Sequence, residues 1–311
     1  MMFSYRLYHL EGTLKENHEG KIEFRKKVTA MDLFSYKERG EKIAMITAYD
    51  YPSAKLADEI GADCILVGDS LGMVVLGYEN TLPVTMADML HHCKAVARGA
   101  KSPLLIGDMP FLSYQASTTD AIINAGRLLA EGGMGAVKLE GGREQACTIR
   151  AIVDAGIPVM GHIGLTPQSV HKLGGFRPRG RTSDEAMGIL EDAIALQEAG
   201  CFALVLESVP VELSRLIGQT IGIPVIGIGA GVECDGQVLV LHDAVGLTDT
   251  YQPKFTRKFV ETRQTMADGL AMYIAAVKDG SFPAEDHTVH MKDLVYQDLL
   301  EEMKIHRKLA K

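Results

Sequence analysis

The chain has 311 residues, a formal net charge of −8, 47% hydrophobic residues and 23% charged residues, which is typical of a soluble globular protein. No apolar run approaches the roughly 20 residues of a membrane-spanning helix, and the acidic balance leaves no basic stripe for nucleic acid. Five widely spaced cysteines without a CxxC pair indicate reduced thiols, and the N-terminus lacks the pattern of a targeting peptide, so we expect a cytoplasmic protein.

We expect three segments: a variable N-terminal extension over residues 1–28, a barrel domain over residues 29–285, and a C-terminal helical extension over residues 286–311. The phrase TAMDLFSYKERG from Thr29 predicts a short helix that ends at Gly40, placed where it could plug the lower end of a barrel.

From about residue 40 the chain repeats one phrase: a glycine ends a helical stretch, an apolar run follows, and usually a polar residue closes the run. Continuous apolar runs indicate strands that are covered on both faces, as in parallel sheets wrapped by helices. The seven clearest runs end at Asp50, Asp69, Asp108, Glu140, His162, Glu207 and Gly231. An eighth run, HDAVGLT from His242 to Thr248, is shorter.

Helical patterns separate these runs, for example from Ser183 to a stop at Gly200. The alternation predicts an α/β fold, a (β/α)8 TIM barrel with an N-terminal plugging helix and an extra C-terminal helix. An open doubly wound sheet would give much of the same pattern, but no GxGxxG follows the first strand and no Walker-type phosphate loop occurs. The last segment carries Leu294, Val295, Leu299 and Met303 at near-helical spacing. It would either pack against a neighbouring subunit or fray in solvent.

In a parallel barrel, residues that close the strands point into the rim where active sites form. A single Asp after a strand is as readily the N-cap of the next helix, but several acids on one rim repel one another and need a compensating cation. The oxygen ligands of Asp69, Asp108 and Glu140 suit magnesium, with water and a chelating substrate completing the coordination.

Lys138 lies two residues before Glu140 on one predicted strand, so both side chains project into the barrel. A buried lysine needs an anionic partner, either a substrate carboxylate or a neighbouring acid in a structural salt bridge. Glu207 closes a strand on another part of the barrel, where it could support the other groups or act as a general base.

Six phrases carry a family resemblance, and they occur in one order between about Ala44 and His287: GDSLGMVVLGYENTLPVTMADM, GDMPF, VKLEGG, GHIGLTPQSV, VLESVP and PVIGIGAG. In them the chain resembles the ketopantoate hydroxymethyltransferase family. The resemblance implies a β/α-barrel enzyme that transfers a hydroxymethyl group from 5,10-methylenetetrahydrofolate to 3-methyl-2-oxobutanoate. The product is 2-dehydropantoate, on the pathway to pantothenate and coenzyme A, and the route passes through an enolate stabilised by Mg²⁺.

Carried over by position, the resemblance implies the metal ligands Asp69, Asp108 and Glu140, of which Glu140 could act through water. The residues implied to hold the keto acid are Asp69, Ser70, Asp108 and Lys138. The implied proton acceptor is Glu207. We place His162 in the pocket, where it would line the site or polarise the adduct, with a buried histidine bonded to a backbone carbonyl as the alternative.

The resemblance also implies small-molecule substrates and a ring-like homo-oligomer, a decamer in the family. The glycine-rich, basic stretch from His171 to Arg181 would cover the site, meet the acidic folate tail, or remain a solvated loop. One alternative is a magnesium-dependent α-keto acid lyase or mutase of the isocitrate lyase and phosphoenolpyruvate mutase group, although the lyase phrase KKCGH is absent. A non-catalytic metal-binding scaffold would have no need of an inward lysine and a base.

Overall fold

The computed structural model describes residues 13–16, 22–248 and 253–309, so most of the predicted extension over residues 1–28 lies outside the described residues. The chain divides into two compact units, one ending at Val260 and the other beginning at Glu261. In the first unit, strands β1 (Thr13–Glu16) and β2 (Ile22–Arg25) form an antiparallel pair ahead of the main sheet.

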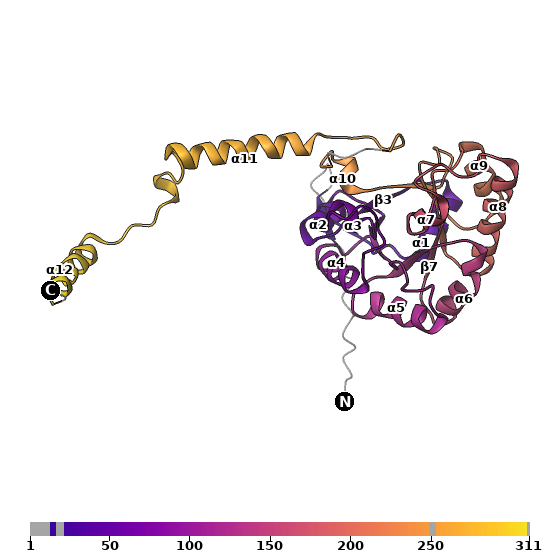
Figure 1. Ribbon diagram of the computed structural model, residues 1–311, viewed down its shortest axis with the longest axis horizontal. Helices are drawn as coiled ribbons and strands as arrows, with labels where there is room; N and C mark the ends of the chain where they lie inside the picture. The colour runs from indigo at the N-terminus through magenta and orange to yellow at the C-terminus, as the bar shows by residue number, and fades with distance from the viewer. Residues whose placement is uncertain (1–12, 17–21, 249–252, 310–311) are drawn as a thin grey trace, which may run out of the picture. The chain divides into compact units, whose positions relative to one another are not determined.

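Eight parallel strands close the main sheet into a barrel, in the order β10-β3-β4-β5-β6-β7-β8-β9. The strands are β3 (Ile43–Thr47), β4 (Cys64–Val67), β5 (Leu104–Asp108), β6 (Ala136–Glu140), β7 (Val159–Gly164), β8 (Ala203–Glu207), β9 (Val225–Ile228) and β10 (Gly236–Leu239). The longer helices surround them as a ring in chain order (Figure 1). These helices are α2 (Tyr51–Glu59), α4 (Met86–Gly99), α5 (Thr118–Ala130), α6 (Ala146–Asp154), α8 (Ser183–Glu198) and α9 (Val211–Thr220). The predicted (β/α)8 barrel is confirmed.

Short helical turns occupy the loops that follow several strands. They are α3 (Leu71–Val74), η1 (Arg143–Gln145), η2 (Pro167–Ser169), α7 (Val170–Leu173) and α10 (Leu241–Ala244). Because these turns follow the carboxyl ends of the strands, they lie on the face of the barrel where active sites form.

The eighth strand is not where the sequence pattern placed it. Residues 242–248 contain part of α10, and β10 closes the barrel instead, pairing with β9 on one side and β3 on the other. β10 has only four residues and begins with Gly236 and the exposed Gln237, so it lacks a continuous apolar run. The glycine is required, because a Cβ at Gly236 would lie 2.5 Å from the carbonyl oxygen of Ile43.

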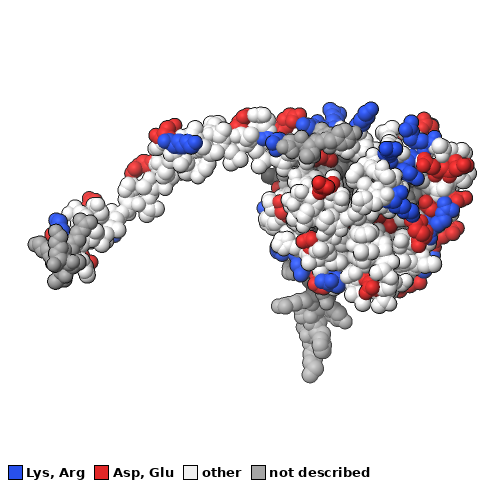
Figure 2. Space-filling model, in the orientation of Figure 1, with Lys and Arg blue, Asp and Glu red and all other residues white. Residues whose placement is uncertain are grey.

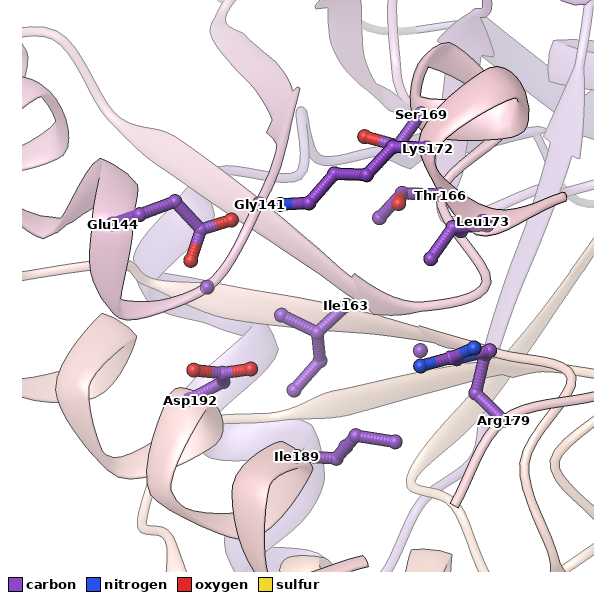
Figure 3. Close-up of a pocket in the computed structure, with 12 residues that line it drawn as sticks. Gly141, Glu144, Ile163, Thr166, Ser169, Lys172, Leu173, Arg179, Ile189 and Asp192 are labelled. Atoms are coloured by element: carbon purple, nitrogen blue, oxygen red, sulfur yellow. The ribbon is translucent and has the colours of Figure 1, made fainter. Parts of the chain in front are cut away.

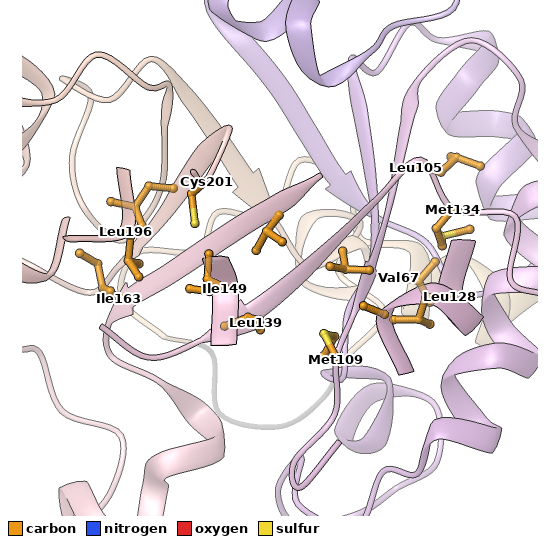
Figure 4. Packing of buried hydrophobic residues seen from close by; sticks show 14 of the residues in the cluster. Val67, Leu105, Met109, Leu128, Met134, Leu139, Ile149, Ile163, Leu196 and Cys201 are labelled. Carbon is orange, nitrogen blue, oxygen red and sulfur yellow. The ribbon is translucent and has the colours of Figure 1, made fainter. Parts of the chain in front are cut away.

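The larger part of the core fills the layer between the strands and the surrounding helices (Figure 4). Leu139 of β6 and Ile163 of β7 are buried there, together with Leu128 of α5, Ile149 of α6 and Leu196 of α8. This packing explains the continuous apolar runs of the strands, because residues on one side of each strand face the helices and residues on the other side face the barrel interior.

Helix α1 (Ala30–Arg39) lies at the amino-terminal end of the barrel strands, as predicted for a plug. Thr29 caps its start, and Gly40 ends it in the left-handed conformation, with φ of 67°. Leu33 is fully buried among side chains of the barrel interior. Lys37 donates a hydrogen bond of 2.9 Å to Asp235, just before β10. The lower end of the barrel is therefore closed, and the open mouth is at the carboxyl ends of the strands.

Helix caps explain three polar residues at the starts of helices α2 and α4. Asp50 is the N-cap of α2, where its carboxylate accepts a hydrogen bond of 2.8 Å from the backbone N–H of Ser53. Thr85 and Asp88 form a reciprocal capping box at the start of α4. For Asp50, the alternative that an acid after a strand is the N-cap of the next helix is therefore correct.

The second unit contains α11 (Thr262–Asp279), the short turn η3 (Glu285–His287) and α12 (Asp293–Leu309). Helix α12 is the predicted extra C-terminal helix. The four apolar residues singled out there are 42 to 80% exposed in the single chain. The expected barrel domain runs to residue 285 and so includes α11, whereas the first compact unit ends at Val260. The domain boundaries remain predictions.

Replacing Leu33 by alanine tests the role of the plug. We expect Leu33→Ala to lower the free energy of unfolding by about 2 to 5 kcal/mol, because it leaves a cavity at the closed end of the barrel. Met31 on the same helix is 70% exposed, so Met31→Ala is the matched control and should change stability little. The free energies of unfolding of both variants can be measured by chemical denaturation. If Leu33→Ala lowers this free energy no more than Met31→Ala does, α1 is not a packed plug.

Candidate active site

The register of the parallel strands brings the predicted site residues together. Asp108 at the end of β5 pairs with Lys138 of β6, and Glu140 of β6 pairs with His162 of β7. Paired positions on neighbouring strands place their side chains on the same face of the sheet. Glu207 closes β8, the next strand around the barrel. The acids and bases therefore line one part of the mouth.

Asp108 and Lys138 form a buried ion pair. The ammonium group of Lys138 donates to both carboxylate oxygens of Asp108, over 2.8 and 3.0 Å. The backbone N–H of Asp69, which follows β4, donates to the same carboxylate over 3.2 Å. All three residues are at most 4% exposed. The structural salt bridge considered for Lys138 is thus present, and a substrate carboxylate would have to share this lysine with Asp108.

His162 connects Glu140 to Glu207. Its Nδ1 lies 3.5 Å from Oε1 of Glu140, and its Nε2 lies 3.1 Å from Oε2 of Glu207. Both distances suit an ion pair, although neither contact has the angle of a hydrogen bond. The side chain of Glu207 is 14% exposed, whereas those of His162 and Glu140 are each 3% exposed. His162 faces carboxylates, so the alternative of a histidine bonded to a backbone carbonyl is not what the structure shows.

Burial and mutual repulsion make the negative charge at the mouth costly. Burial raises the pKa of Asp69 well above its usual value, and the charges of Asp108 and Glu140 raise it further. Burial lowers the pKa of Lys138, but the three surrounding carboxylates outweigh this and raise it above its usual value. Lys138 therefore stays positively charged, and this one charge does not balance the three acids.

His162 also offsets part of the negative charge at the mouth. Burial and the charge of Lys138 lower the pKa of His162, whereas contacts with Glu140 and Glu207 raise it, and the result is about 9. A protonated His162 therefore lies between the two glutamates at neutral pH. Even so, four carboxyl groups face two basic side chains, and a divalent cation would balance the remaining charge.

The donor set fits magnesium in kind. The side chains of Asp69, Asp108 and Glu140 offer oxygen atoms, and magnesium prefers oxygen ligands while retaining several waters. Within residues 13–16, 22–248 and 253–309, no three His, Cys, Asp or Glu side chains converge as a ready-made cage for a metal. The three side chains therefore fit a site that is not closed by protein ligands alone and that water and a chelating substrate would complete.

Ser70 lies beside Asp69 at the start of α3, where its hydroxyl makes no cap hydrogen bond. Its Oγ lies 2.8 Å from the hydroxyl of Tyr49, which is buried at the end of the loop after β3. This contact orients Ser70 at the mouth of the barrel. Tyr49 was not singled out from the sequence, because a tyrosine between a strand and a helix usually serves packing.

Gln168 and Tyr114 are two further residues of the site, and neither was predicted from the sequence. Gln168 donates from Nε2 to Oδ2 of Asp69 over 2.9 Å, and its backbone N–H donates to Oε2 of Glu140 over 2.9 Å. The hydroxyl of Tyr114 donates to Oε1 of Gln168 over 2.8 Å. Gln168 belongs to the quoted phrase GHIGLTPQSV, so its position in that phrase was a usable signal. Tyr114 carried none.

A cavity of about 150 Å³ lies next to this group, bordered by the residues that follow Glu140 and Gln168 (Figure 3). Lys172 and Arg179, both from the basic stretch between His171 and Arg181, line the cavity together with Glu144. The basic stretch thus borders the mouth of the barrel. Whether it closes over a substrate remains a prediction.

The outer surface of the barrel unit carries mixed charge. On the face shown in Figure 2, basic and acidic side chains are interspersed over α8 and α9. Arg143, for example, contacts both Glu191 and Asp192 of α8. Among the described residues, none of the helices combines the length and the apolar character that a membrane-spanning segment needs.

Residues 27–285 match the family model described as ketopantoate hydroxymethyltransferase. Over 264 residues the chain is 57% identical to a 3-methyl-2-oxobutanoate hydroxymethyltransferase from Moorella thermoacetica, which covers 85% of this chain and 98% of that protein. A protein of the same name from Carboxydothermus hydrogenoformans is 56% identical over 265 residues, or 85% of this chain and 96% of that protein. The phosphoenolpyruvate phosphomutase from Streptomyces platensis subsp. rosaceus is similar in fold alone, with a TM-score of 0.57 at 16% identity, covering 90% of this chain and 98% of that one.

Removing one partner of the buried ion pair tests its energetic role. We expect Lys138→Met to lower the free energy of unfolding of the metal-free protein by about 3 to 5 kcal/mol, because Asp108 is left buried without its cation. The double variant Lys138→Met with Asp108→Asn should lose less than this single variant. Lys94 forms an exposed pair with Glu131, so Lys94→Met is the control and should cost less than about 1 kcal/mol. If the loss of stability in the double variant equals the sum of the losses in the two single variants, Lys138 and Asp108 are not energetically coupled.

Proposed function

The chain belongs to the ketopantoate hydroxymethyltransferase family, and we propose that it transfers a hydroxymethyl group from 5,10-methylenetetrahydrofolate to 3-methyl-2-oxobutanoate, giving 2-dehydropantoate for pantothenate biosynthesis. One observation on the candidate active site supports the proposed reaction. Three acids, Asp69, Asp108 and Glu140, are buried, whereas the side chain of Glu207 is 14% exposed and contacts His162. This difference in exposure suits a reaction that needs both a metal-bound keto acid and an accessible base.

The buried group would bind the keto acid. Asp69, Asp108 and Glu140 are the proposed ligands for Mg²⁺, with Glu140 acting directly or through water. Magnesium, when bound, would act as a Lewis acid that stabilises the negative charge developing on the keto oxygen. Lys138 and Ser70 would orient the substrate carboxylate, and the positive charge of Lys138 supports this role because it is held at the mouth by Asp108.

Glu207 would accept the proton from C3 of the keto acid. The electron pair of that C–H bond then forms the new bond from C3 to the methylene carbon of the folate, and the two bonds from this carbon to N5 and N10 break. One water supplies the hydroxyl of the product. The two folate nitrogens take up the proton from Glu207 and one proton of that water, and tetrahydrofolate leaves. His162 would hold Glu207 in place through its Nε2, 3.1 Å away, and would line the pocket.

The alternative of an α-keto acid lyase or mutase has less support. The similarity to phosphoenolpyruvate phosphomutase concerns the fold, and at 16% identity it does not extend to chemistry. The relatives at 56 and 57% identity are named as hydroxymethyltransferases. We therefore propose the transfer reaction alone, in a cytoplasmic homo-oligomer. The exposed apolar side chains of α12 support contact with a neighbouring subunit.

The decisive assay supplies 3-methyl-2-oxobutanoate, 5,10-methylenetetrahydrofolate and magnesium. We expect 2-dehydropantoate to form and the activity to disappear when a chelator removes the metal, because the substrate enolate would lose its stabilising charge. Product would be identified by mass spectrometry. If the folded, metal-loaded protein makes no 2-dehydropantoate, the proposed reaction is wrong.

Replacing Glu207 by glutamine separates binding from proton transfer. We expect Glu207→Gln to bind the keto acid but to exchange its C3 hydrogen with deuterated water about 10² to 10⁴ times more slowly, because the amide cannot accept the proton. Exchange can be followed by proton NMR without folate. Glu212 is exposed on α9, so Glu212→Gln is the matched control and should exchange at the normal rate. Normal exchange in Glu207→Gln would remove it as the base.

A further inference from the structure

Gln168 places a side-chain amide among the buried carboxylates of the mouth. It belongs to η2, in the loop that follows β7, and is 5% exposed. The loop therefore carries an uncharged side chain into a group otherwise made of charges. Burial of a polar amide is costly unless its donors and acceptor are satisfied, so its partners indicate what it is for.

All hydrogen-bonding groups of this side chain have partners. Nε2 donates to Oδ2 of Asp69 and to the carbonyl oxygen of Met109, each over 2.9 Å. Oε1 accepts from the hydroxyl of Tyr114 over 2.8 Å and from Nε2 of Gln115 over 3.3 Å. With its oxygen fixed by these donors, the amide can present only its NH₂ group to Asp69.

The main chain of the same residue reaches a second acid. The N–H of Gln168 donates to Oε2 of Glu140 over 2.9 Å. Tyr114 lies between them, because its hydroxyl also contacts the backbone of Glu140. One residue thus holds carboxylates that belong to β6 and to the loop after β4, two places that are not neighbours in the barrel.

An amide orients a carboxylate without neutralising it. Lys138 also orients an acid, Asp108, but it brings a positive charge that competes with any cation at the same oxygens. Gln168 holds Asp69 without adding a positive charge beside its oxygens. Residues that hold metal ligands through such hydrogen bonds pre-organise them, and their loss commonly weakens metal binding 10- to 100-fold.

We propose that Gln168 is a positioning residue that pre-organises Asp69 and Glu140 for a divalent cation. This inference rests on the proposed function in so far as that function needs the metal. Its role is distinct from ligation, since a neutral amide nitrogen has no free electron pair to offer. The two hydrogen bonds come from different parts of the residue. The side chain of Gln168 holds Asp69, whereas its backbone N–H holds Glu140 and would remain after a substitution of the side chain.

The test measures cation binding without any substrate, by titration calorimetry with Mg²⁺ and by the electron paramagnetic resonance of Mn²⁺. Gln168→Met keeps the volume of the side chain and removes its polar atoms. We expect it to bind Mn²⁺ about 10 to 100 times more weakly than the unaltered protein. Tyr114→Phe frees the amide oxygen to turn and should weaken binding by a smaller factor, about 2- to 10-fold.

Gln197 supplies the matched control. It accepts hydrogen bonds from the backbone N–H groups of Gly222 and Ile223, ahead of β9 and at the opposite end of the barrel from the mouth. Gln197→Ala should lower thermal stability without changing the affinity for Mn²⁺. If Gln168→Met behaves like Gln197→Ala, losing stability but no affinity, the positioning role is wrong.

The outcomes also separate this inference from the proposed reaction. Failure of the unaltered protein to bind Mg²⁺ or Mn²⁺ would overturn the metal-dependent reaction and the inference together. Normal binding by the unaltered protein with unchanged affinity in Gln168→Met would overturn the inference alone. Should Gln168→Met not fold, Tyr114→Phe decides between the two results.

Discussion

Four carboxyl groups share two basic side chains at the mouth of the barrel, and the rest of the site is arranged around this shortage of positive charge. The arrangement follows from the parallel register, because strand ends at the same height place their closing residues side by side. Asp108 meets Lys138 and Glu140 meets His162 in this way. Every acid of the group has a hydrogen-bond donor or an ion-pair partner within reach, which lowers the cost of burying it.

The two ends of the barrel differ, and packing at one end offsets the free-energy cost of burying charged groups at the other. At the lower end α1 inserts Leu33 into an apolar interior, so this end contributes packing. At the upper end the strands finish in charged residues, and the loops that follow bring in further polar groups. Stability and chemistry are therefore supplied by opposite ends of the same strands, which is the usual division in this fold.

Local sequence patterns predicted the site residues that lie at the ends of strands. They did not predict the residues that a loop distant in sequence brings to the site. An acid that ends an apolar run is a signal within a few residues, so Asp69, Asp108 and Glu140 could be placed at one rim. Gln168 reaches Asp69 across 99 positions in the sequence, and no local pattern encodes that contact. The eighth strand was misplaced for a related reason: β10 is held by its neighbours β3 and β9 and has little apolar sequence of its own.

The two aspartates are held by partners of different charge, and this difference gives them unequal roles under the proposed function. Lys138 contacts both oxygens of Asp108, so a cation beside Asp108 meets a carboxylate that an ammonium group already neutralises. Gln168 holds one oxygen of Asp69 through a neutral donor, so no positively charged side chain competes with a cation there. A dication is drawn more strongly to the uncompensated carboxylate. Asp69 is then the stronger anchor for the metal, while Asp108 chiefly keeps Lys138 where an anionic substrate can reach it.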